Sequence, residues 1–211
     1  MDKLQILPTT LYKFTVPSKL YKKICELTEE INFETVTTRA GQPYFGKSKI
    51  CFNASVGDKK WNSIVNYTNN KLEEVCKDLN YLKYFESLKN CLMWVNRSGN
   101  NQWHHPHKHK WSLLSGIIYV KGSSGSTYFI RESEYALDAT FDFDDSYKQN
   151  NQIIYTHKPE NGTMLIFPST LKHSVSENTS ETPRVTISFN SFFDGQLGSR
   201  DALSFVDVKL K

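Results

Sequence analysis

Residues 94–120 read WVNRSGNNQWHHPHKHKWSLLSGIIYV and join a histidine-rich segment directly to an apolar run. Four of the chain's 6 histidines lie here, at positions 104, 105, 107 and 109. Residues i and i+2 of a strand share a face, so a His-x-His pair on one strand can bind one metal ion. The apolar run that follows is rich in β-forming residues. The stretch therefore predicts β structure that carries a metal site.

Two His-x-His pairs are available in this cluster, His105 with His107 and His107 with His109. Pro106 separates the first pair, and proline cannot donate a hydrogen bond to a sheet, which disfavours that pair inside a strand. The second pair continues without a break into the apolar run. The sequence therefore favours His107 and His109 as ligands on a single strand.

A mononuclear site needs a further ligand from elsewhere in the chain. His173 is the leading candidate because it follows an apolar strand and a turn at Pro168, and His157 is the alternative. Non-haem iron oxygenases commonly use two histidines and one carboxylate. No Asp or Glu occurs between Glu86 and Glu132, so the histidine-bearing strand cannot supply a carboxylate. The site is either a three-histidine centre or one that a distant acid completes.

The segment RVTISFNSFF, residues 184–193, carries a polar face within an otherwise apolar strand. Alternation places Arg184, Thr186, Ser188 and Asn190 on one face and apolar residues on the other. Arginine binds carboxylates in a bidentate manner, and neighbouring hydroxyls can satisfy the remaining lone pairs. This face suits the distal carboxylate of a small dicarboxylic acid whose other end binds the metal.

The rest of the chain predicts a single domain over 1–211, with a helical flank at about 17–90 and a β core at about 91–195. Apolar residues recur at helical spacing from Ser18 to Ile31, and again after Asp58, a candidate N-cap. Short strands separated by turn residues favour a jelly roll, and 137–151 is expected to be an acidic loop. The expected strands are Leu92–Asn96, Trp111–Val120, Thr127–Ile130, Gln152–His157, Thr163–Phe167, His173–Ser176 and Arg184–Phe193.

Composition excludes several other classes of protein. The chain has no apolar run long enough for a membrane span and no secretory signal pattern. Its 4 cysteines are scattered without a CxxC pair, so we expect reduced thiols and a cytoplasmic location. The net charge of +4 comes without a long basic cluster, so nucleic acid is not indicated as a partner. Nothing in the composition predicts an oligomeric state.

Three segments together resemble a known family: residues 94–120 quoted above, GTMLIFPSTLKHSV at 162–175 and RVTISFN at 184–190. They are similar to the 2-oxoglutarate/Fe(II) oxygenases of bacteria and phages, which are related to the prolyl 4-hydroxylases. The resemblance implies a double-stranded β-helix (a cupin-like jelly roll) and a dioxygenase that uses Fe(II), 2-oxoglutarate and O2 to hydroxylate a second substrate. A peptidyl side chain is one candidate for that substrate.

Carried over position by position, the resemblance implies that His107, His109 and His173 bind the metal and that Arg184 anchors the 2-oxoglutarate carboxylate. The positions where further cosubstrate contacts fall are Tyr119, Thr186 and Ser188. The chain departs from the wider superfamily at His109, where an Asp is usual, which makes the site more positive and weakens its preference for Fe(II) over softer ions.

Two other functions remain open on the sequence. One is a cupin-like three-histidine metalloenzyme that does not use 2-oxoglutarate and in which Arg184 is structural. The other is a non-catalytic jelly-roll module, such as part of a phage particle or a carbohydrate binder, in which the histidine cluster is incidental. Metal analysis separates the second alternative from the enzymes, and titration with 2-oxoglutarate separates the two enzymes from each other.

Overall fold

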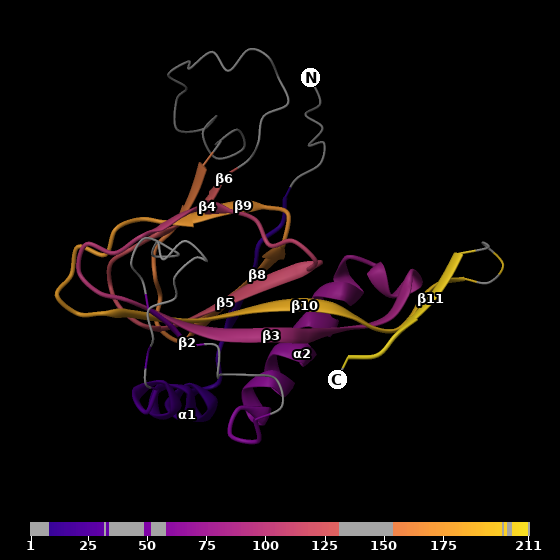
Figure 1. Ribbon diagram of the computed structural model, residues 1–211, viewed down its shortest axis with the longest axis horizontal. Helices are drawn as coiled ribbons and strands as arrows, with labels where there is room; N and C mark the ends of the chain where they lie inside the picture. The colour runs from indigo at the N-terminus through magenta and orange to yellow at the C-terminus, as the bar shows by residue number, and fades with distance from the viewer. Residues whose placement is uncertain are drawn as a thin grey trace, which may run out of the picture.

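The computed structural model describes residues 9–31, 33, 49–51, 58–130, 154–199, 201 and 204–210. In this part of the chain two antiparallel sheets face each other, and helices α1 and α2 cover the outer face of the larger sheet (Figure 1). This is the expected mainly β fold with flanking helices. The acidic loop expected at 137–151 lies outside the described residues.

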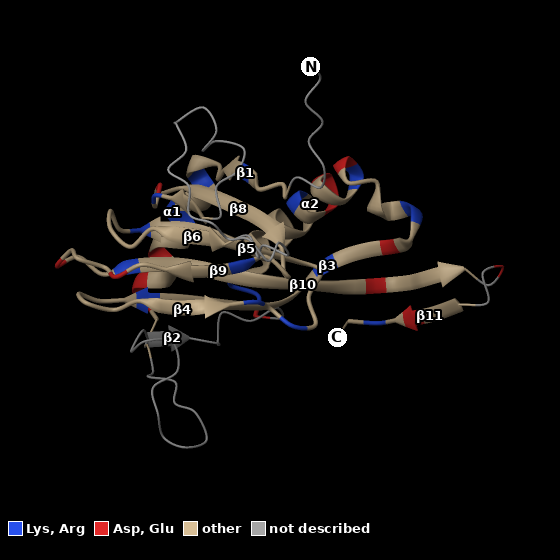
Figure 2. Cartoon of the chain, turned by 90° about the horizontal axis from the view of Figure 1, so that it is seen from above, with Lys and Arg blue, Asp and Glu red and all other residues tan. Residues whose placement is uncertain are grey.

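The larger sheet has the strand order β1-β8-β5-β10-β3-β2, and β11 pairs with the far end of β10. The smaller sheet has the order β4-β9-β6-β7. Figure 2 shows the long strands β3 and β10 running past the smaller sheet toward β11. The bounds of the larger sheet are β1 Tyr12–Thr15, β2 Lys49–Cys51, β3 Phe85–Ser98, β5 Leu114–Lys121, β8 Thr163–Pro168, β10 Arg184–Ser199 and β11 Ser204–Val208. Those of the smaller sheet are β4 His104–His107, β6 Thr127–Ile130, β7 Ile154–His157 and β9 Lys172–Val175.

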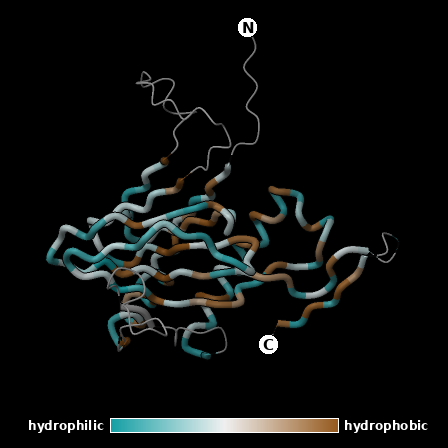
Figure 3. Tube along the Cα trace, turned by 45° about the horizontal axis from the view of Figure 1, so that its top comes forward, coloured by the Kyte–Doolittle hydropathy of each residue, from teal (hydrophilic) through white to brown (hydrophobic). Residues whose placement is uncertain are grey.

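The central strands of the larger sheet are buried on both faces, because the helices cover one face and the smaller sheet covers the other. On β10, Val185, Ile187 and Phe189 belong to the main apolar core under the helices, while Arg184 and Thr186 face the space between the sheets. Apolar residues accordingly gather along these central strands (Figure 3). The alternation predicted for residues 184–190 places the polar face inside the barrel.

A second apolar cluster lines the space between the sheets. It consists of Ile117, Tyr119, Phe129, Leu165 and Phe167, from strands β5, β6 and β8. The neighbouring residues of β5 and β8 point the other way, into the core under the helices. The interior of the barrel is therefore apolar on one side and polar where β10 crosses it.

Helix α1 (Ser18–Glu29) agrees with the predicted range, and α2 covers Asn62–Asp78, followed by a short 3-10 turn at Tyr81–Lys83. The prediction that Asp58 caps α2 is wrong. The N-cap is Trp61, and the Asp58 Oδ1 instead accepts the Lys60 N–H at 3.0 Å. Aspartate readily closes such a turn two residues ahead of itself, and here that turn precedes the helix.

Several strand limits differ from the predicted ones. β5 begins at Leu114, because Trp111 has a φ of 61° and ends a turn. β3 and β10 extend far beyond their apolar centres because they pair with each other from Arg184 to Leu197. The strands β1, β2, β4 and β11 are absent from the predicted set because each has only 3 to 5 residues.

Strand β4 also corrects the argument about Pro106, which lies inside the strand. β4 is an edge strand, and its pairing with β9 is irregular between His104 and His107. Proline is tolerated at sheet edges and bulges because no neighbouring strand needs its missing N–H. The proline therefore does not exclude β structure on its N-terminal side.

Within the described residues, no helix is both long and apolar enough to cross a membrane. The three cysteines whose side chains are described, Cys25, Cys76 and Cys91, are free thiols. Burial raises the pKa of the Cys76 thiol to about 11, so this thiol stays protonated and unreactive at neutral pH.

Candidate metal centre

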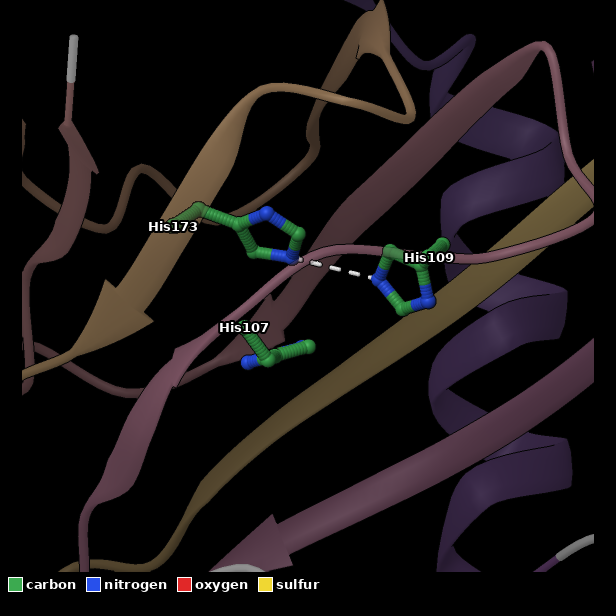
Figure 4. A group of neighbouring side chains, drawn as sticks. All are labelled: His107, His109 and His173. Carbon is green, nitrogen blue, oxygen red and sulfur yellow. Dashed lines mark hydrogen bonds between the residues drawn. The ribbon is translucent and has the colours of Figure 1, made fainter. Parts of the chain in front are cut away.

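The fold brings His107, His109 and His173 together between the two sheets (Figure 4). One ring nitrogen from each of them lies within 4.8 Å of those of the other two. His107 ends β4 and pairs directly with His173 of β9, so these two belong to neighbouring strands of the smaller sheet. Among the described residues, the group consists of these three histidines and contains no carboxylate.

The expectation that His107 and His109 share one strand is wrong. β4 ends at His107, and His109 lies two residues beyond it. The His109 N–H donates to the Ser169 carbonyl at 3.0 Å, which holds this segment against the turn between β8 and β9. The two histidines approach each other because the chain bends around the centre, with ring centroids 5.1 Å apart.

Backbone carbonyls orient two of the three rings. The Nδ1 of His107 lies 2.8 Å from the carbonyl oxygen of His105, and the Nδ1 of His173 lies 2.9 Å from that of Leu171. A carbonyl only accepts, so each neutral ring carries its proton on Nδ1 and leaves Nε2 unprotonated. Metal-binding histidines are commonly held in this way, with the second nitrogen donating to a carbonyl or carboxylate.

The spacing of the nitrogens suits a metal ion. The Nε2 atoms of His109 and His173 are 3.2 Å apart (Figure 4). Two nitrogens that each bind a cation at about 2.1 Å lie roughly 3 Å apart when the angle between them is near 90°. Imidazole nitrogens suit iron, nickel, copper and zinc, so the donor set fits a transition-metal ion and does not by itself choose among them.

The pKa values of the three histidines are lowered, so the rings stay uncharged and can bind a cation. Burial, with a smaller contribution from His107, lowers the pKa of His173 to about 3 and that of His109 to about 4. Burial also lowers the pKa of His107. The Phe167 ring lies 4.9 Å from the ring of His173 and contributes to this dry environment. At neutral pH all three rings are therefore uncharged, as metal ligands must be.

Arg184 lies at the start of β10, in the interior of the barrel, with 4% of its surface exposed. Its Nη2 donates to the Thr127 Oγ1 at 3.3 Å, and its Cζ lies 5.7 Å from the centre of the Tyr119 ring. No carboxylate among the described residues pairs with it, and its Nε has no hydrogen-bond partner there. Burial lowers the pKa of the guanidinium. A buried cation without an anionic partner is costly, so this site is suited to an anionic ligand.

The predicted cosubstrate residues occupy two parts of the interior. Tyr119 lies beside Arg184, and its hydroxyl donates to the Thr127 Oγ1 at 2.9 Å. Thr186 and Ser188 face inward from β10, and both accept hydrogen bonds from the Asn96 Nδ2, at 3.5 and 3.0 Å. Their polar atoms are thus engaged with β3, one strand away.

The other histidines have different surroundings. His157, the alternative ligand, is buried at the end of β7 with its ring 5.3 Å from that of Tyr119, and it is not part of the metal-binding group. His105 is exposed. The His104 ring lies 5.3 Å from the His107 ring, and burial, then the charges of His107 and Arg184, lowers its pKa to about 3. His104 therefore lies near both the histidine group and the arginine.

Sequence reasoning missed three polar residues of the interior, Thr127, Ser115 and Ser169. Each is a lone hydroxyl within or just after an apolar segment. The only signal available was the presence of a polar residue in a strand expected to be buried, which gives no spacing to match.

The family comparison agrees with this geometry. Residues 92–190 match the family described as "Putative 2OG-Fe(II) oxygenase". No curated protein sequence matches the chain.

Solved structures of low sequence identity share the fold. The α-ketoglutarate-dependent epimerase SnoN from nogalamycin biosynthesis has 10% identity and a TM-score of 0.62, over 90% of this chain and 82% of that chain. A Pseudomonas putida prolyl-4-hydroxylase has 10% identity and a TM-score of 0.59, over 89% and 94% of the two chains. HygX from Streptomyces hygroscopicus, with nickel and 2-oxoglutarate bound, has 10% identity and a TM-score of 0.61, over 96% and 93%.

Fold and site thus define a double-stranded β-helix with a histidine-rich metal centre in its interior. The segment that matches the 2-oxoglutarate/Fe(II) oxygenase family, 92–190, contains every candidate site residue. The protein is an oxidoreductase of this class, with Fe(II) as cofactor and 2-oxoglutarate as cosubstrate.

Proposed function

We propose that His107, His109 and His173 hold the Fe(II) ion and that Arg184 binds the distal carboxylate of 2-oxoglutarate. The observation that carries this proposal is the buried guanidinium of Arg184, which has no carboxylate partner among the described residues. It lies in the same interior as three neutral histidines whose ring nitrogens converge. A ligand with an anionic end and a metal-chelating end satisfies both groups at once.

Each side chain has a distinct task in this proposal. Arg184 supplies a bidentate contact to the carboxylate. Thr127, on β6 of the smaller sheet, accepts a hydrogen bond from the guanidinium and orients it. Tyr119 forms part of the apolar wall beside it. Because this interior excludes water, the charge pair gains more than it would at the surface. The histidines donate through Nε2 and stay neutral at the pH of the cell.

When bound, Fe(II) supplies the activation of O2 that couples the conversion of 2-oxoglutarate to succinate and CO2 with oxidation of a second substrate. We propose hydroxylation of a C–H bond as the outcome, with a peptidyl side chain as one substrate class. The prolyl-4-hydroxylase among the similar structures supports that class. We also propose a cytoplasmic location, which the free thiols support.

The decisive experiment is anaerobic reconstitution of the protein with Fe(II), followed by addition of 2-oxoglutarate. A weak visible charge-transfer band should appear when the cosubstrate chelates the iron, and succinate should form once air is admitted. Iron binding without this band and without succinate would favour the cupin-like metalloenzyme. Absence of stoichiometric metal would favour the non-catalytic module.

A further inference from the structure

The ring of His109 faces the partly buried carboxamide of Asn190, whereas the other two ligand rings face backbone carbonyls. Its Nδ1 lies 3.4 Å from the Asn190 side-chain nitrogen. The carbonyls beside His107 and His173 can only accept, so they impose a proton on Nδ1 of those rings. A carboxamide can donate through its nitrogen or accept through its oxygen. His109 is therefore the ring of this group whose neighbour allows either tautomer.

Asn190 is itself connected to a row of three serine hydroxyls. Its Oδ1 lies 2.8 Å from the Ser115 Oγ, which lies 2.7 Å from the Ser169 Oγ. The Ser169 Oγ lies 2.7 Å from the Ser112 Oγ, which is 2.9 Å from the Leu114 carbonyl oxygen. Ser115 and Ser169 are buried. The row runs from the end of the loop after His109 to the centre of β10.

The Asn190 carboxamide can take two orientations, which differ in whether its oxygen or its nitrogen faces Ser115. In the first orientation, Ser115 donates to the Asn190 Oδ1 and the Asn190 Nδ2 donates to the Nδ1 of His109, while Ser169 donates to Ser112 and Ser112 to the Leu114 carbonyl. The His109 proton then resides on Nε2, which lies 3.2 Å from the Nε2 of His173 and donates to it. This orientation satisfies the centre without a cation, but it blocks His109 as a ligand.

In the second orientation the carboxamide is turned by half a rotation. The His109 Nδ1–H now donates to Asn190 Oδ1, and Asn190 Nδ2 donates to Ser115. The serines donate away from Asn190, and the row ends at the Leu114 carbonyl oxygen, a pure acceptor. Every donor still has an acceptor, and the Nε2 of His109 is left with a lone pair for a metal ion.

We propose that Asn190 is a positioning residue that selects the ligand tautomer of His109, and that the carboxamide and the Ser115 hydroxyl reverse direction when a cation binds. The proposal rests on the proposed metal site. Asn190 lies beside the Nδ1 of His109, in the place that backbone carbonyls occupy beside His107 and His173. Groups that accept from the second nitrogen of a metal-bound histidine typically affect metal affinity about 10- to 100-fold.

The first test is calorimetric titration of the full-length apo protein with Co²⁺. Asn190→Leu removes the acceptor and should weaken Co²⁺ binding about 10- to 100-fold. Asn190→Asp supplies a group that only accepts, so it should restore affinity to the wild-type value or better. The control is Asn90→Leu, which removes a buried carboxamide that donates to Thr68 away from the centre, and it should leave Co²⁺ affinity unchanged.

If Asn190 served only packing, Asn190→Asp should weaken Co²⁺ binding at least as much as Asn190→Leu, because a partly buried carboxylate disturbs packing no less than leucine does. The visible spectrum of bound Co²⁺ supplies a second readout. It should change in Asn190→Leu, where the third nitrogen is held loosely, and should match wild type in Asn190→Asp. Equal affinity of wild type and Asn190→Leu would overturn the inference while leaving the proposed function intact.

The second test needs no variant and therefore does not depend on folding of the leucine protein. Histidine ¹⁵N NMR distinguishes the two tautomers directly. His109 should carry its proton on Nε2 in the apo protein and on Nδ1 in the Zn²⁺-loaded protein, whereas His107 and His173 should carry it on Nδ1 in both. An apo His109 already protonated on Nδ1 would overturn the reversal. Failure of the wild-type protein to bind any of these ions would overturn the proposed function as well.

Discussion

Arg184 and Tyr119 share a single acceptor inside the barrel, the Thr127 Oγ1, at 3.3 and 2.9 Å. The three residues come from β10, β5 and β6, so this shared acceptor joins the two sheets. A threonine hydroxyl is neutral and therefore orients the guanidinium without compensating its charge. Among the described residues no carboxylate pairs with Arg184, so the proposed 2-oxoglutarate carboxylate would compensate its charge.

Arg184→Ala should weaken 2-oxoglutarate binding strongly and leave metal content unchanged. Removing one partner of a buried charged pair costs ~2–5 kcal/mol, which corresponds to about 30- to 3,000-fold in affinity. Arg184→Lys should recover only part of the loss, since lysine cannot make the bidentate contact. Calorimetry on Mn²⁺-loaded protein measures both variants.

The control for this series is Arg97→Ala, which removes an arginine of β3 whose Cζ lies 5.7 Å from the centre of the Phe33 ring. It should bind 2-oxoglutarate as wild type does. If the Arg184→Ala protein binds the cosubstrate equally well, the anchor has been assigned to the wrong residue.

The three proposed ligands should be separable from their neighbours by metal analysis. His107→Ala, His109→Ala and His173→Ala should each abolish stoichiometric metal at neutral pH. His105→Ala is the control, because its ring is exposed and its carbonyl, which orients His107, is retained. His104→Ala should also retain metal. Loss of metal in the His105 or His104 variant alone would show that the centre uses a different set of rings.

His109→Asp should convert the centre to two histidines and one carboxylate and should retain iron. The carboxylate can accept from Asn190 Nδ2, which lies 3.4 Å from the present ring. Oxygen ligands suit Mn²⁺ better than imidazole does, so the affinity ratio of Mn²⁺ to Ni²⁺ should rise. Competition titrations measure that ratio. An unchanged ratio would indicate that residue 109 does not contact the metal.

The apo protein should lose stability as the pH falls below about 6.5. The folded-state pKa values of His109 and His173 are lowered to about 4 and 3, so between those values and 6.5 the unfolded chain binds more protons than the folded one. By linkage, unfolding becomes easier as the pH falls through this window, by up to about 1.4 kcal/mol per pH unit for each such group.

Denaturant unfolding of wild type and His173→Asn at a series of pH values tests this dependence. The variant should lose less stability between pH 6.5 and 4, and the two proteins should show parallel curves above pH 7, where the histidine is neutral in both states. Identical slopes below pH 6.5 would show that His173 is not buried in neutral form.

Gly116→Ala should destabilise the barrel itself. Gly116 of β5 lies opposite Phe189 of β10, and an added Cβ would overlap the phenylalanine ring. Overpacking of this kind costs about 1–3 kcal/mol. A thermal unfolding experiment should therefore show a lower Tm, and the double variant with Phe189→Leu should recover part of it. A Tm equal to wild type would contradict the packing of these two strands.

The polar face of β10 was predictable because a period of two is explicit in RVTISFN, and strands of this length rarely slip against a buried core. The location of His109 outside the strand was not predictable. Pro106 argues against a strand only when a neighbour must accept or donate there, and β4 lies at an edge. Local sequence does not reveal which strands become edges, so the His107/His109 pair was placed on one strand, whereas β4 ends at His107, two residues before His109.

The hydroxyls of Thr127, Ser115 and Ser169 were missed for a different reason. Their importance comes from contacts with residues 57, 75 and 54 positions away along the chain. No periodicity within a strand encodes such distant partners. The resemblance to a family supplied the histidines and the arginine because they lie in recognisable motifs, whereas isolated serines do not.

Because β4 lies at the edge of its sheet, it is weakly held against unfolding. β4 is paired with β9 through only two residue positions and is interrupted between them, so little of the sheet ladder holds it. Ligation of His109 and His173 by one ion would close a ring of chain between residues 64 apart in sequence. The ion then acts as a removable cross-link, comparable to a disulfide in the chain freedom that it takes from the unfolded state. If the proposed ligands hold the ion, the part of the barrel that carries the histidines would depend for its stability on the bound metal.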